Sequence, residues 1–309
     1  MSHKKSSDFG SEETQLQHFY HHKNSYLQQA SAQFFSRTSL NIKIGIELEF
    51  YLTNSDGSQL FDDKILHDFI SDLSKKIPTN SLIYKIEKEQ GQGQIEVKTA
   101  FDSDLLKICE DISKLKLMAK TLAEERNLIV SFAAQQFLDD CGSALQFNIS
   151  LHDVDDKNIF WFDENILHKT ANALLQKTDE MMIFLAPEES DYVRFSTQIN
   201  RDLFKKGKFT APVNLSFGAD NRTCAIRIPT KSKRLEYRIG AANCDPALCM
   251  SAILLAILFG IENSAHPVNQ IHGNAFDSQY EVKNFCQNFD EARKKFFAEE
   301  NFIRTSMLF

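Results

Sequence analysis

The stretch KIGIELEFYL, residues 43–52, alternates apolar and polar side chains. The apolar residues Leu48 and Phe50 have one parity, and the acids Glu47 and Glu49 have the other. Side chains at positions i and i+2 of a β-strand point to the same face of a sheet. The pattern therefore predicts a strand whose apolar face packs against a core and whose second face carries two carboxylates.

The composition is that of a chain able to bury a sizeable core. Its 309 residues are 42% hydrophobic and 11% aromatic, which suits one large domain or two closely joined ones. The net charge of −7 argues against a nucleic-acid partner, because phosphate binding requires clustered Lys and Arg. The apolar stretch 247–261 is shorter than the ~20 residues of a membrane span. We expect it to be a buried helix and expect no membrane partner.

The six cysteines show neither a CxxC pair nor a Cys/His metal spacing. No signal peptide is recognised before them. Free thiols in a reducing compartment, and hence a cytoplasmic location, are the expectation.

The predicted elements mix helices and strands without a regular alternation, which favours an α+β fold with an antiparallel sheet and helices packed against it. Residues 1–12 are polar and are predicted to be disordered, and residues 14–35 have the spacing of a docking helix. Further helices are predicted near 62–77, 103–126, 163–185, 246–263 and 281–300. Strands are predicted near 128–134, 143–152, 212–217, 223–228 and 234–239, with two short strands between the helices at 62–77 and 103–126.

Two of these predicted strands repeat the polar face of the first. SALQFNISLHD, residues 143–153, places Gln146, Asn148 and Ser150 on one face, and RLEYRIG, residues 234–240, does the same with Arg234, Glu236 and Arg238. The alternative to a functional site is that each polar face is the wet side of an antiparallel sheet.

The segment EQGQGQIEV, residues 89–97, favours the functional interpretation. Gly91 and Gly93 supply a tight turn, and Glu89 and Glu96 flank it. Carboxylates gathered without thiolates suit a hard cation such as Mg²⁺ or Mn²⁺.

Several motifs together resemble the catalytic domain of glutamine synthetase. They occur in that family's order over roughly residues 43–263, and several independent motifs in one order are more specific than any single match. The resemblance implies a curved antiparallel sheet, a half-barrel with helices on its outer face, in a catalytic domain at 43–309 that follows an N-terminal helical segment at 1–42. The motifs are GIELEF, ExGxGQxEV, CGSALQFNISL, APVNLSFGADNRTCAIRIP and RLEYRIGAANCDPALCMSAIL.

The resemblance also implies two or three divalent cations, Mg²⁺ or Mn²⁺, at the waist of a funnel. Gln146 stands where the family usually has a His ligand, and Ala144 stands at the second Gly of the family's GSGxHxN motif. Glutamate-cysteine ligases resemble this chain in having Gln at that position. The metal ligands implied are Glu47, Glu49, Glu89, Glu96, Gln146 and Glu236.

Further roles follow from the same resemblance. Guanidinium groups bind phosphoryl oxygens in two-pronged fashion, and the phosphate-handling arginines implied are Arg222, Arg227 and Arg238. Arg194 is the implied clamp on the α-carboxylate of an acid substrate, with Gly142 beside the substrate's amino end. Thr210 stands where ammonia-using enzymes have a Glu. The nucleotide-binding residues implied are Asn148, Ser150, Lys231 and Arg234.

Two departures from the family bear on function. Residues 1–42 are expected to be helical in place of the family's N-terminal β-grasp domain, which makes a large ring assembly doubtful, although an oligomer is possible. The insertion after Arg194, which includes NRDLFKKGK, implies a different flap over the site.

The expected activity is that of an ATP-dependent carboxylate-amine ligase. Glutamate or a similar acid would be activated as an acyl-phosphate and attacked by ammonia or another amine. Two alternatives remain: a non-catalytic regulatory homologue that binds metal and nucleotide, and a glutamate-cysteine ligase-like activity.

Overall fold

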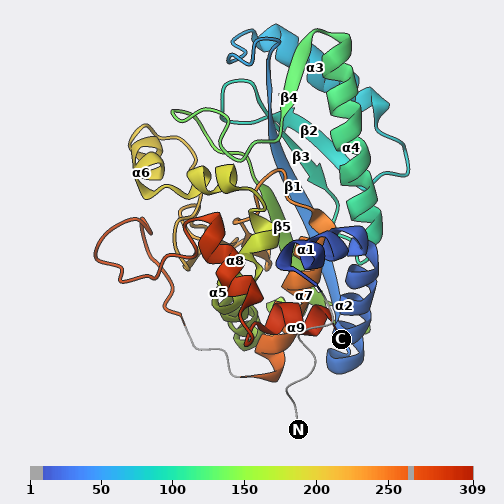
Figure 1. Ribbon diagram of the computed structural model, residues 1–309, viewed down its shortest axis with the longest axis vertical. Coiled ribbons are helices and arrows are strands. Elements are labelled where there is room, and N and C mark those ends of the chain that lie inside the picture. The colour runs from blue at the N-terminus through green and yellow to red at the C-terminus, as the bar shows by residue number, and fades with distance from the viewer. Residues whose placement is uncertain (1–9, 264–267, 309) are drawn as a thin grey trace.

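The computed structural model describes residues 10–263 and 268–308 (Figure 1). The predicted disorder of residues 1–12 falls mainly outside the described residues, and helix α1 (Glu12–His21) begins within that range.

An eight-stranded sheet forms the centre of the molecule. Its order is β2-β3-β1-β5-β8-β7-β6, and β4 pairs with β1 outside this path. The pairs are antiparallel except β6 with β7, which is parallel, so the expectation of an antiparallel sheet holds apart from this pair. The strands are β1 (Asn41–Asn54), β2 (Ile83–Lys88), β3 (Gln94–Thr99), β4 (Leu128–Ser131), β5 (Leu145–His152), β6 (Phe217–Ala219), β7 (Ile226–Ile228) and β8 (Leu235–Tyr237).

The register of β1 brings polar residues of three strands together. Glu49 lies opposite Glu96 of β3, and Glu47 lies opposite Lys98 of β3. On its other side, Glu47 lies opposite Gln146 of β5. Since the intervening residues of β1 are buried and apolar, the alternation predicted from the sequence is confirmed.

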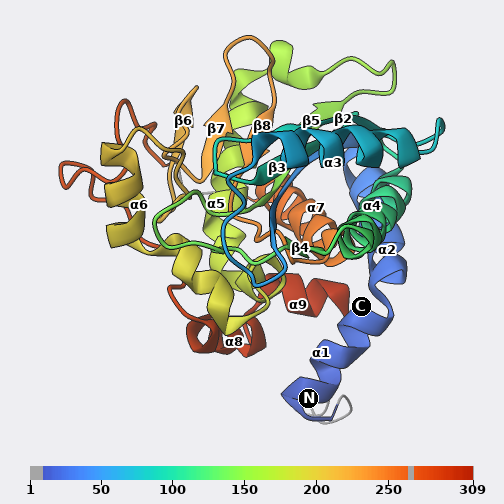
Figure 2. The same cartoon turned by 90° about the horizontal axis from the view of Figure 1, so that it is seen from above.

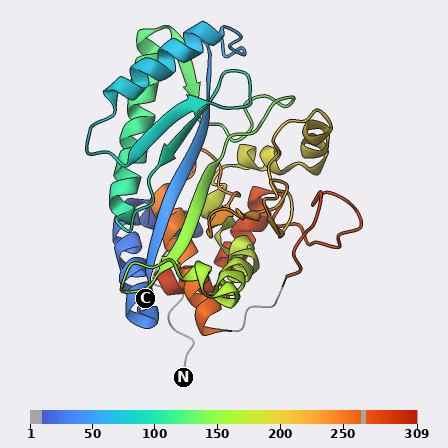
Figure 3. The ribbon, with the colours of Figure 1, turned by 180° about the vertical axis from the view of Figure 1, so that it is seen from behind.

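Helices cover the apolar face of the sheet. The helices α2 (Lys23–Thr38), α4 (Leu105–Glu125) and α7 (Pro246–Glu262) lie in front of the strands in Figure 1 and behind them in Figure 3. The buried α7 packs against α2 and against α5 (Glu164–Leu185). It begins at Asp245, whose carboxylate accepts hydrogen bonds from the first amides of the helix, which is a stabilising N-cap arrangement.

The N-terminal segment docks as two helices, not as the single helix predicted. The backbone leaves the helical conformation at His22, which ends α1 and begins α2. The Phe19 ring packs edge-on against Phe184 of α5 and Phe296, with centroids 5.7 and 5.6 Å apart. The break lets each helix bury its own apolar side.

The other helices are α3 (Asp63–Lys76), α6 (Thr197–Lys205), α8 (Phe289–Phe297) and α9 (Phe302–Met307), with short 3₁₀ segments η1 (Ile159–Trp161) and η2 (Glu189–Phe195). The unpredicted α6 lies in the insertion after Arg194 and projects from the end of the molecule on which β6 lies (Figure 2). Ser196 begins it by accepting a hydrogen bond from the Ile199 amide.

Two predicted boundaries are wrong for identifiable reasons. The helix predicted at 281–300 begins only after Asn288, whose side chain caps it by accepting from the Glu291 amide. The strand predicted near 212–217 is irregular. There, Asn214 forms an isolated bridge with Asn284, and the Leu215 amide donates to the Lys283 carbonyl. The backbone joins the sheet only from Ser216, whose carbonyl accepts from Ile226 of β7.

No helix in the described part of the chain is long and apolar enough to cross a membrane. The six cysteines are buried free thiols, as expected.

Candidate active site

Glu49 is one of the buried acids of the polar face. One carboxylate oxygen accepts a hydrogen bond from the Gln146 side-chain amide at 2.8 Å, and the other accepts from the Ala144 backbone amide at 2.9 Å. Burial, together with the neighbouring carboxylates of Glu96 and Glu89, raises the pKa of Glu49 to about 8, although the charges of Arg194 and Arg238 act to lower it. An acid held only by neutral donors in a dry site is stabilised by a positively charged ligand.

Other acids near the paired strands β1 and β3 also have raised pKa values. Burial is the first cause that raises the pKa of Glu47, Glu89 and Glu96. Carboxylate neighbours add to the effect: Glu236 and Glu96 act on Glu47, and Glu89 acts on Glu96. The five acids predicted as ligands therefore lie near enough to repel one another.

Glu236 is the exception, because two arginines hold it. Its carboxylate accepts from Arg227 at 2.7 Å and from Arg238 at 2.9 Å. Although burial acts in the opposite direction, Arg238 and Arg227 hold the pKa of Glu236 below its usual value. Glu236 is thus ionised and already neutralised by the protein.

The acids fit a divalent metal in the chemistry of their donors, which are all oxygens. Within residues 10–263 and 268–308, however, no three His, Cys, Asp or Glu side chains lie close enough together to hold one ion. Protein donors hold the carboxylates of Glu96, Glu236 and Glu49. Among the described residues, Glu47, Glu49 and Glu89 form no ion pair, and Glu47 and Glu49 accept only from the neutral donors Asn148, Gln146 and Ala144.

An enclosed pocket brings half of the predicted site residues together. Its volume of ≈ 20 Å³ is room for about one water molecule. Among its lining residues are Gln94, Cys141, Phe209 and Ala211, which the sequence did not single out. The predicted residues that line it are Glu49, Glu89, Gly142, Gln146, Arg194, Thr210, Arg222 and Arg238.

Arg194 is carried into this pocket by η2 and is 3% exposed. Its two terminal nitrogens donate to the backbone carbonyls of Ile239 and Arg238, each at 3.0 Å. Burial lowers the pKa of Arg194 to about 10, while Glu49 acts against this change. The Nε atom is buried and has no hydrogen-bond partner among the described residues, so it is one of the donors left for an anion.

Gly142 lies against Arg194, as expected of residues that share a subsite. A Cβ atom at Gly142 would come within 2.9 Å of the Arg194 Cγ and within 2.9 Å of the Ala134 carbonyl oxygen. These contacts are too close for a side chain, so the arginine stem fits only against a glycine.

Residues 206–211 form a lid over the enclosed pocket. The Phe209 amide donates to the side-chain oxygen of Gln90, and Lys208 forms an ion pair with Asp140 at 2.6 Å. The Arg222 guanidinium lies over the Phe209 ring at 4.6 Å, a favourable cation–π distance. The lid follows the α6 insertion, the segment in which an altered flap is predicted.

A second, open pocket of ≈ 390 Å³ contains three of the four residues predicted to bind nucleotide: Ser150, Lys231 and Arg234. Asn148, the fourth, accepts from Arg234 Nε at 2.7 Å. The pocket is also lined by Lys43, Phe101, His152, Asn158, Trp161, Ser232 and Lys233.

Phe101 and Trp161 are aromatic residues that the sequence analysis missed. Their exposed fractions are 52% and 54%, which is high for large apolar side chains beside a polar strand face. The Phe101 ring packs on Gly45 of β1, where an added Cβ would lie 2.8 Å from the ring. The GIELEF motif therefore contributes Gly45, against which this ring packs, as well as two acids.

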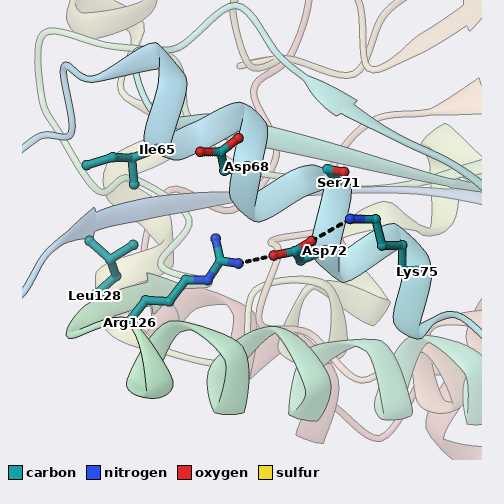
Figure 4. Close-up of a pocket in the computed structure, with 7 residues that line it drawn as sticks. All are labelled: Ile65, Asp68, Ser71, Asp72, Lys75, Arg126 and Leu128. Atoms are coloured by element: carbon teal, nitrogen blue, oxygen red, sulfur yellow. Dashed lines mark hydrogen bonds and ion pairs between the residues drawn. The ribbon is translucent and has the colours of Figure 1, made fainter.

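Another cavity, of ≈ 520 Å³, lies beside α3 and contains none of the predicted site residues (Figure 4). Asp72 in its wall bonds to Lys75 at 2.8 Å and also to Arg126. Because Asp72 is paired with Lys75 and Arg126, the cavity offers no comparable set of buried, repelling carboxylates.

The fold and the site define a protein whose curved sheet presents buried acids and arginines next to an open, partly aromatic pocket. Residues 62–308 match the family model described as "Glutamine synthetase, catalytic domain". The chain belongs to this family. Glu47 and Glu49 precede the matched range.

Among the curated relatives, gamma-glutamylputrescine synthetase PuuA of Escherichia coli is 26% identical over 271 residues, covering 76% of this chain and 54% of the relative. Glutamine synthetase of Sulfolobus acidocaldarius is 29% identical over 234 residues, covering 69% and 46%. The chain thus spans about half the length of the curated relatives it matches.

A solved structure described as a GmaS/ADP complex superposes with a TM-score of 0.78. It is 21% identical, and the match covers 92% of this chain and 71% of the other. This similarity confirms the predicted fold class.

Proposed function

We propose that this chain is an ATP-dependent ligase that joins the γ-carboxylate of glutamate, or a similar acid, to an amine. One observation carries the proposal: a continuous polar network links the two pockets. Arg234 of the open pocket bonds to Asn148, which donates to Glu47 at 3.1 Å. Arg234 also lies 3.9 Å from Glu236, which pairs with Arg238 of the enclosed pocket at 2.9 Å. A phosphoryl donor and an acceptor carboxylate bound on either side would meet along this network.

In the proposed arrangement, the open pocket takes ATP. Phe101 and Trp161 supply faces on which a purine can stack, while Lys231 and Arg234 offer positive charge to the phosphates. This assignment leaves the γ-phosphate directed toward the acids and arginines of the sheet.

The enclosed pocket takes the acid substrate. Arg194 orients its α-carboxylate through the unpartnered Nε. Since a cavity of ≈ 20 Å³ is far too small for an amino acid, the lid at 206–211 has to move for substrate to enter. The contacts of Lys208 and Phe209 are the ones that break.

Chemistry then proceeds in two displacements. The substrate γ-carboxylate oxygen attacks the γ-phosphorus and ADP leaves; the amine nitrogen attacks the acyl carbon, and phosphate leaves as the amine loses a proton. Arg222, Arg227 and Arg238 stabilise the charge that develops on the phosphoryl oxygens. Glu49 and Glu89, which line the same pocket, would hold Mg²⁺ or Mn²⁺, and the ion would supply charge neutralisation at these oxygens.

The acceptor is proposed to be an amine larger than ammonia. Thr210 is buried, and its backbone carbonyl accepts from Arg238 at 3.1 Å. Its neutral hydroxyl cannot offset the loss of hydration that an ammonium ion suffers on entering the site. A larger amine gains contacts remote from its nitrogen that help to orient the attack. The relative named gamma-glutamylputrescine synthetase supports this choice.

The proposal is tested by following phosphate release with ATP, Mg²⁺ or Mn²⁺ and glutamate while the amine is varied. Putrescine and other polyamines, cysteine and further amino acids are compared with ammonium at matched ionic strength and pH. We expect one larger amine to exceed ammonium. Glutamine formation above every other product would contradict the acceptor assignment, and γ-glutamylcysteine as the main product would favour the glutamate-cysteine ligase-like alternative.

A non-catalytic regulatory function is the second candidate. It is favoured by the protein donors that hold Glu96 and Glu236 and by the closed lid. ATP binding measured by calorimetry, without phosphate release for any amine, would support that function over the ligase.

A further inference from the structure

Lys98 lies inside the acidic face of the sheet, where the sequence patterns gave it no role. It is on β3, two residues after Glu96, and therefore points to the same side of the sheet. Across the β1–β3 seam it is opposite Glu47. Its ammonium nitrogen is 2.8 Å from Glu96 and 3.0 Å from Glu87 of β2.

The surroundings of Lys98 distinguish it from an ordinary surface lysine. Its side chain is 25% exposed, and that of Glu96, its closer partner, is 8% exposed. The ammonium charge also acts on Glu47, lowering the pKa of that acid against the effects of burial and carboxylate neighbours. The ammonium group of Lys98 thus acts on acids of three adjacent strands: Glu47 of β1, Glu87 of β2 and Glu96 of β3.

Lys85 of β2 provides a natural comparison. It lies opposite Lys98 in the β2–β3 register, but its side chain is 50% exposed and it pairs only with Glu87, at 2.7 Å. A pair of this kind contributes little to stability and is screened by salt. Lys98 lies beside the buried Glu96 and the half-buried Glu47, and Lys85 lies at the edge of this group.

We propose that Lys98 is a built-in cation that replaces one divalent ion on the Glu47–Glu96 side of the acidic face, leaving metal binding to the Glu49–Glu89 side. This inference rests on the proposed metal-dependent function. A covalently attached ammonium needs no association step, and its position excludes a second cation by charge repulsion. It also occupies an oxygen of Glu96 that a metal would need.

The consequence is a site with fewer divalent ions and one permanent charge. Lysine is a compact point charge with three donors, so it can neutralise carboxylates without offering an open coordination position. The positive charge on this side of the face would then be present at any metal concentration. The metal requirement would be confined to the side that adjoins the enclosed pocket, where Glu49 and Glu89 line the wall.

The test is a Mn²⁺ titration of the full chain, followed by electron paramagnetic resonance of free Mn²⁺. Lys98→Gln removes the charge but retains amide donors for Glu96, and Lys98→Arg keeps the charge. Lys85→Gln is the matched control, because it removes a lysine charge from the neighbouring strand at the edge of the same acids. Circular dichroism checks folding with and without Mn²⁺.

We expect Lys98→Gln to bind about one more Mn²⁺ per chain than the wild type, or to bind Mn²⁺ at least about tenfold more tightly. Lys98→Arg and Lys85→Gln should match the wild type. A Lys98→Gln protein that folds only with Mn²⁺ would also support the proposal, since the ion would then stand in for the ammonium.

Equal, non-zero binding by the wild type and Lys98→Gln would overturn the role of Lys98 and leave the proposed function standing. No Mn²⁺ binding by either protein would overturn both. Increased binding by Lys98→Arg, or a Lys98→Gln chain that stays unfolded at every Mn²⁺ concentration, would also contradict the inference.

Discussion

The Gln146 side chain connects an acid to an arginine: its amide nitrogen donates to Glu49 at 2.8 Å, and its carbonyl oxygen accepts from Arg238 at 3.2 Å. An amide both donates and accepts. Gln146 can therefore satisfy a carboxylate and a guanidinium that line the same buried pocket. Glu49 nevertheless remains without a direct cationic partner in this contact. A bound metal would therefore offset the cost of burying a charged carboxylate at Glu49 more than at the other acids.

Divalent metal should stabilise the fold, because a ligand that binds only the native state raises its free energy of unfolding. We expect Mg²⁺ or Mn²⁺ at ~100-fold above its Kd to raise Tm by about 4 °C. The Glu49→Gln variant should show a much smaller increase. Differential scanning calorimetry with a NaCl control at equal ionic strength checks this, and an unchanged Tm with and without ATP would refute the metal site.

Arg194→Lys should weaken the acid substrate much more than ATP. Lysine retains a charge but loses the Nε–H donor and the fork that bonds Ile239 and Arg238. We expect KM for glutamate to rise by about 10- to 100-fold, equivalent to ~1.4–2.8 kcal/mol, and KM for ATP to change by less than about threefold. Steady-state kinetics provide the measurement.

Alanine is the poorer substitution at Arg194, because it leaves two buried carbonyls without donors at a cost of ~1–3 kcal/mol each. Arg201→Lys is a matched control on α6, where the arginine donates to the Phe276 carbonyl at 2.9 Å. Equal losses for both substrates in Arg194→Lys would remove this residue from the acid subsite.

Gly45→Ala should weaken ATP by displacing the Phe101 ring, since the new Cβ would lie 2.8 Å from it. Phe101→Ala should have a similar effect, with a loss of ~1 kcal/mol or more of stacking and burial. Isothermal titration calorimetry with ATP compares the two variants with their double variant. If both act through the same ring, the double variant is no weaker than Phe101→Ala; additive losses would count against the shared mechanism.

Asp191 should make stability depend on pH between about 4 and 6. Burial raises the pKa of Asp191 to about 6 from its ordinary 3.8, against hydrogen bonds from the Glu188 amide and Asn243. In this window the folded chain holds a proton that the unfolded chain has lost. The contribution of Asp191 is therefore greatest at low pH and is lost as pH rises toward 6, by about 2 to 3 kcal/mol in all.

Asp191→Asn tests this effect, because an amide oxygen can still accept from Glu188. The difference in the free energy of unfolding between Asp191→Asn and the wild type should change with pH below about 6 and be constant above it. Urea denaturation at several pH values measures it. A constant difference from pH 4 to pH 8 would show that Asp191 does not titrate in this way.

Local sequence patterns predicted the elements that have a strong period and a clear boundary. The helix near 246–263 was predictable because its apolar run follows Asp245 and Pro246, which favour a helix start. The break at His22 was not, since both sides of it have helical spacing and only Phe19 packing against α5 requires two axes. The α6 helix, which lies in the polar insertion after Arg194, was not predicted either, because only the folded chain reveals it.

The candidate site divides in a similar way. The parity of β1 placed Glu47 and Glu49 on one face, and motif order pointed to Arg194. What Arg194 contacts was not predictable, because the carbonyls of Ile239 and Arg238 that it binds come from residues distant in the chain.

The sequence by itself determined which side chains share a strand face, because a period of two follows from the geometry of one extended backbone. It therefore fixed the acidic face of β1 and its apolar reverse. Only the tertiary structure decided which charges meet. Lys98 reaches Glu87 and faces Glu47 because of the β2–β3–β1 register, and Phe209 reaches Gln90 because the lid folds back across the pocket. These contacts join separate segments, and pairing and packing of the whole chain set their distances.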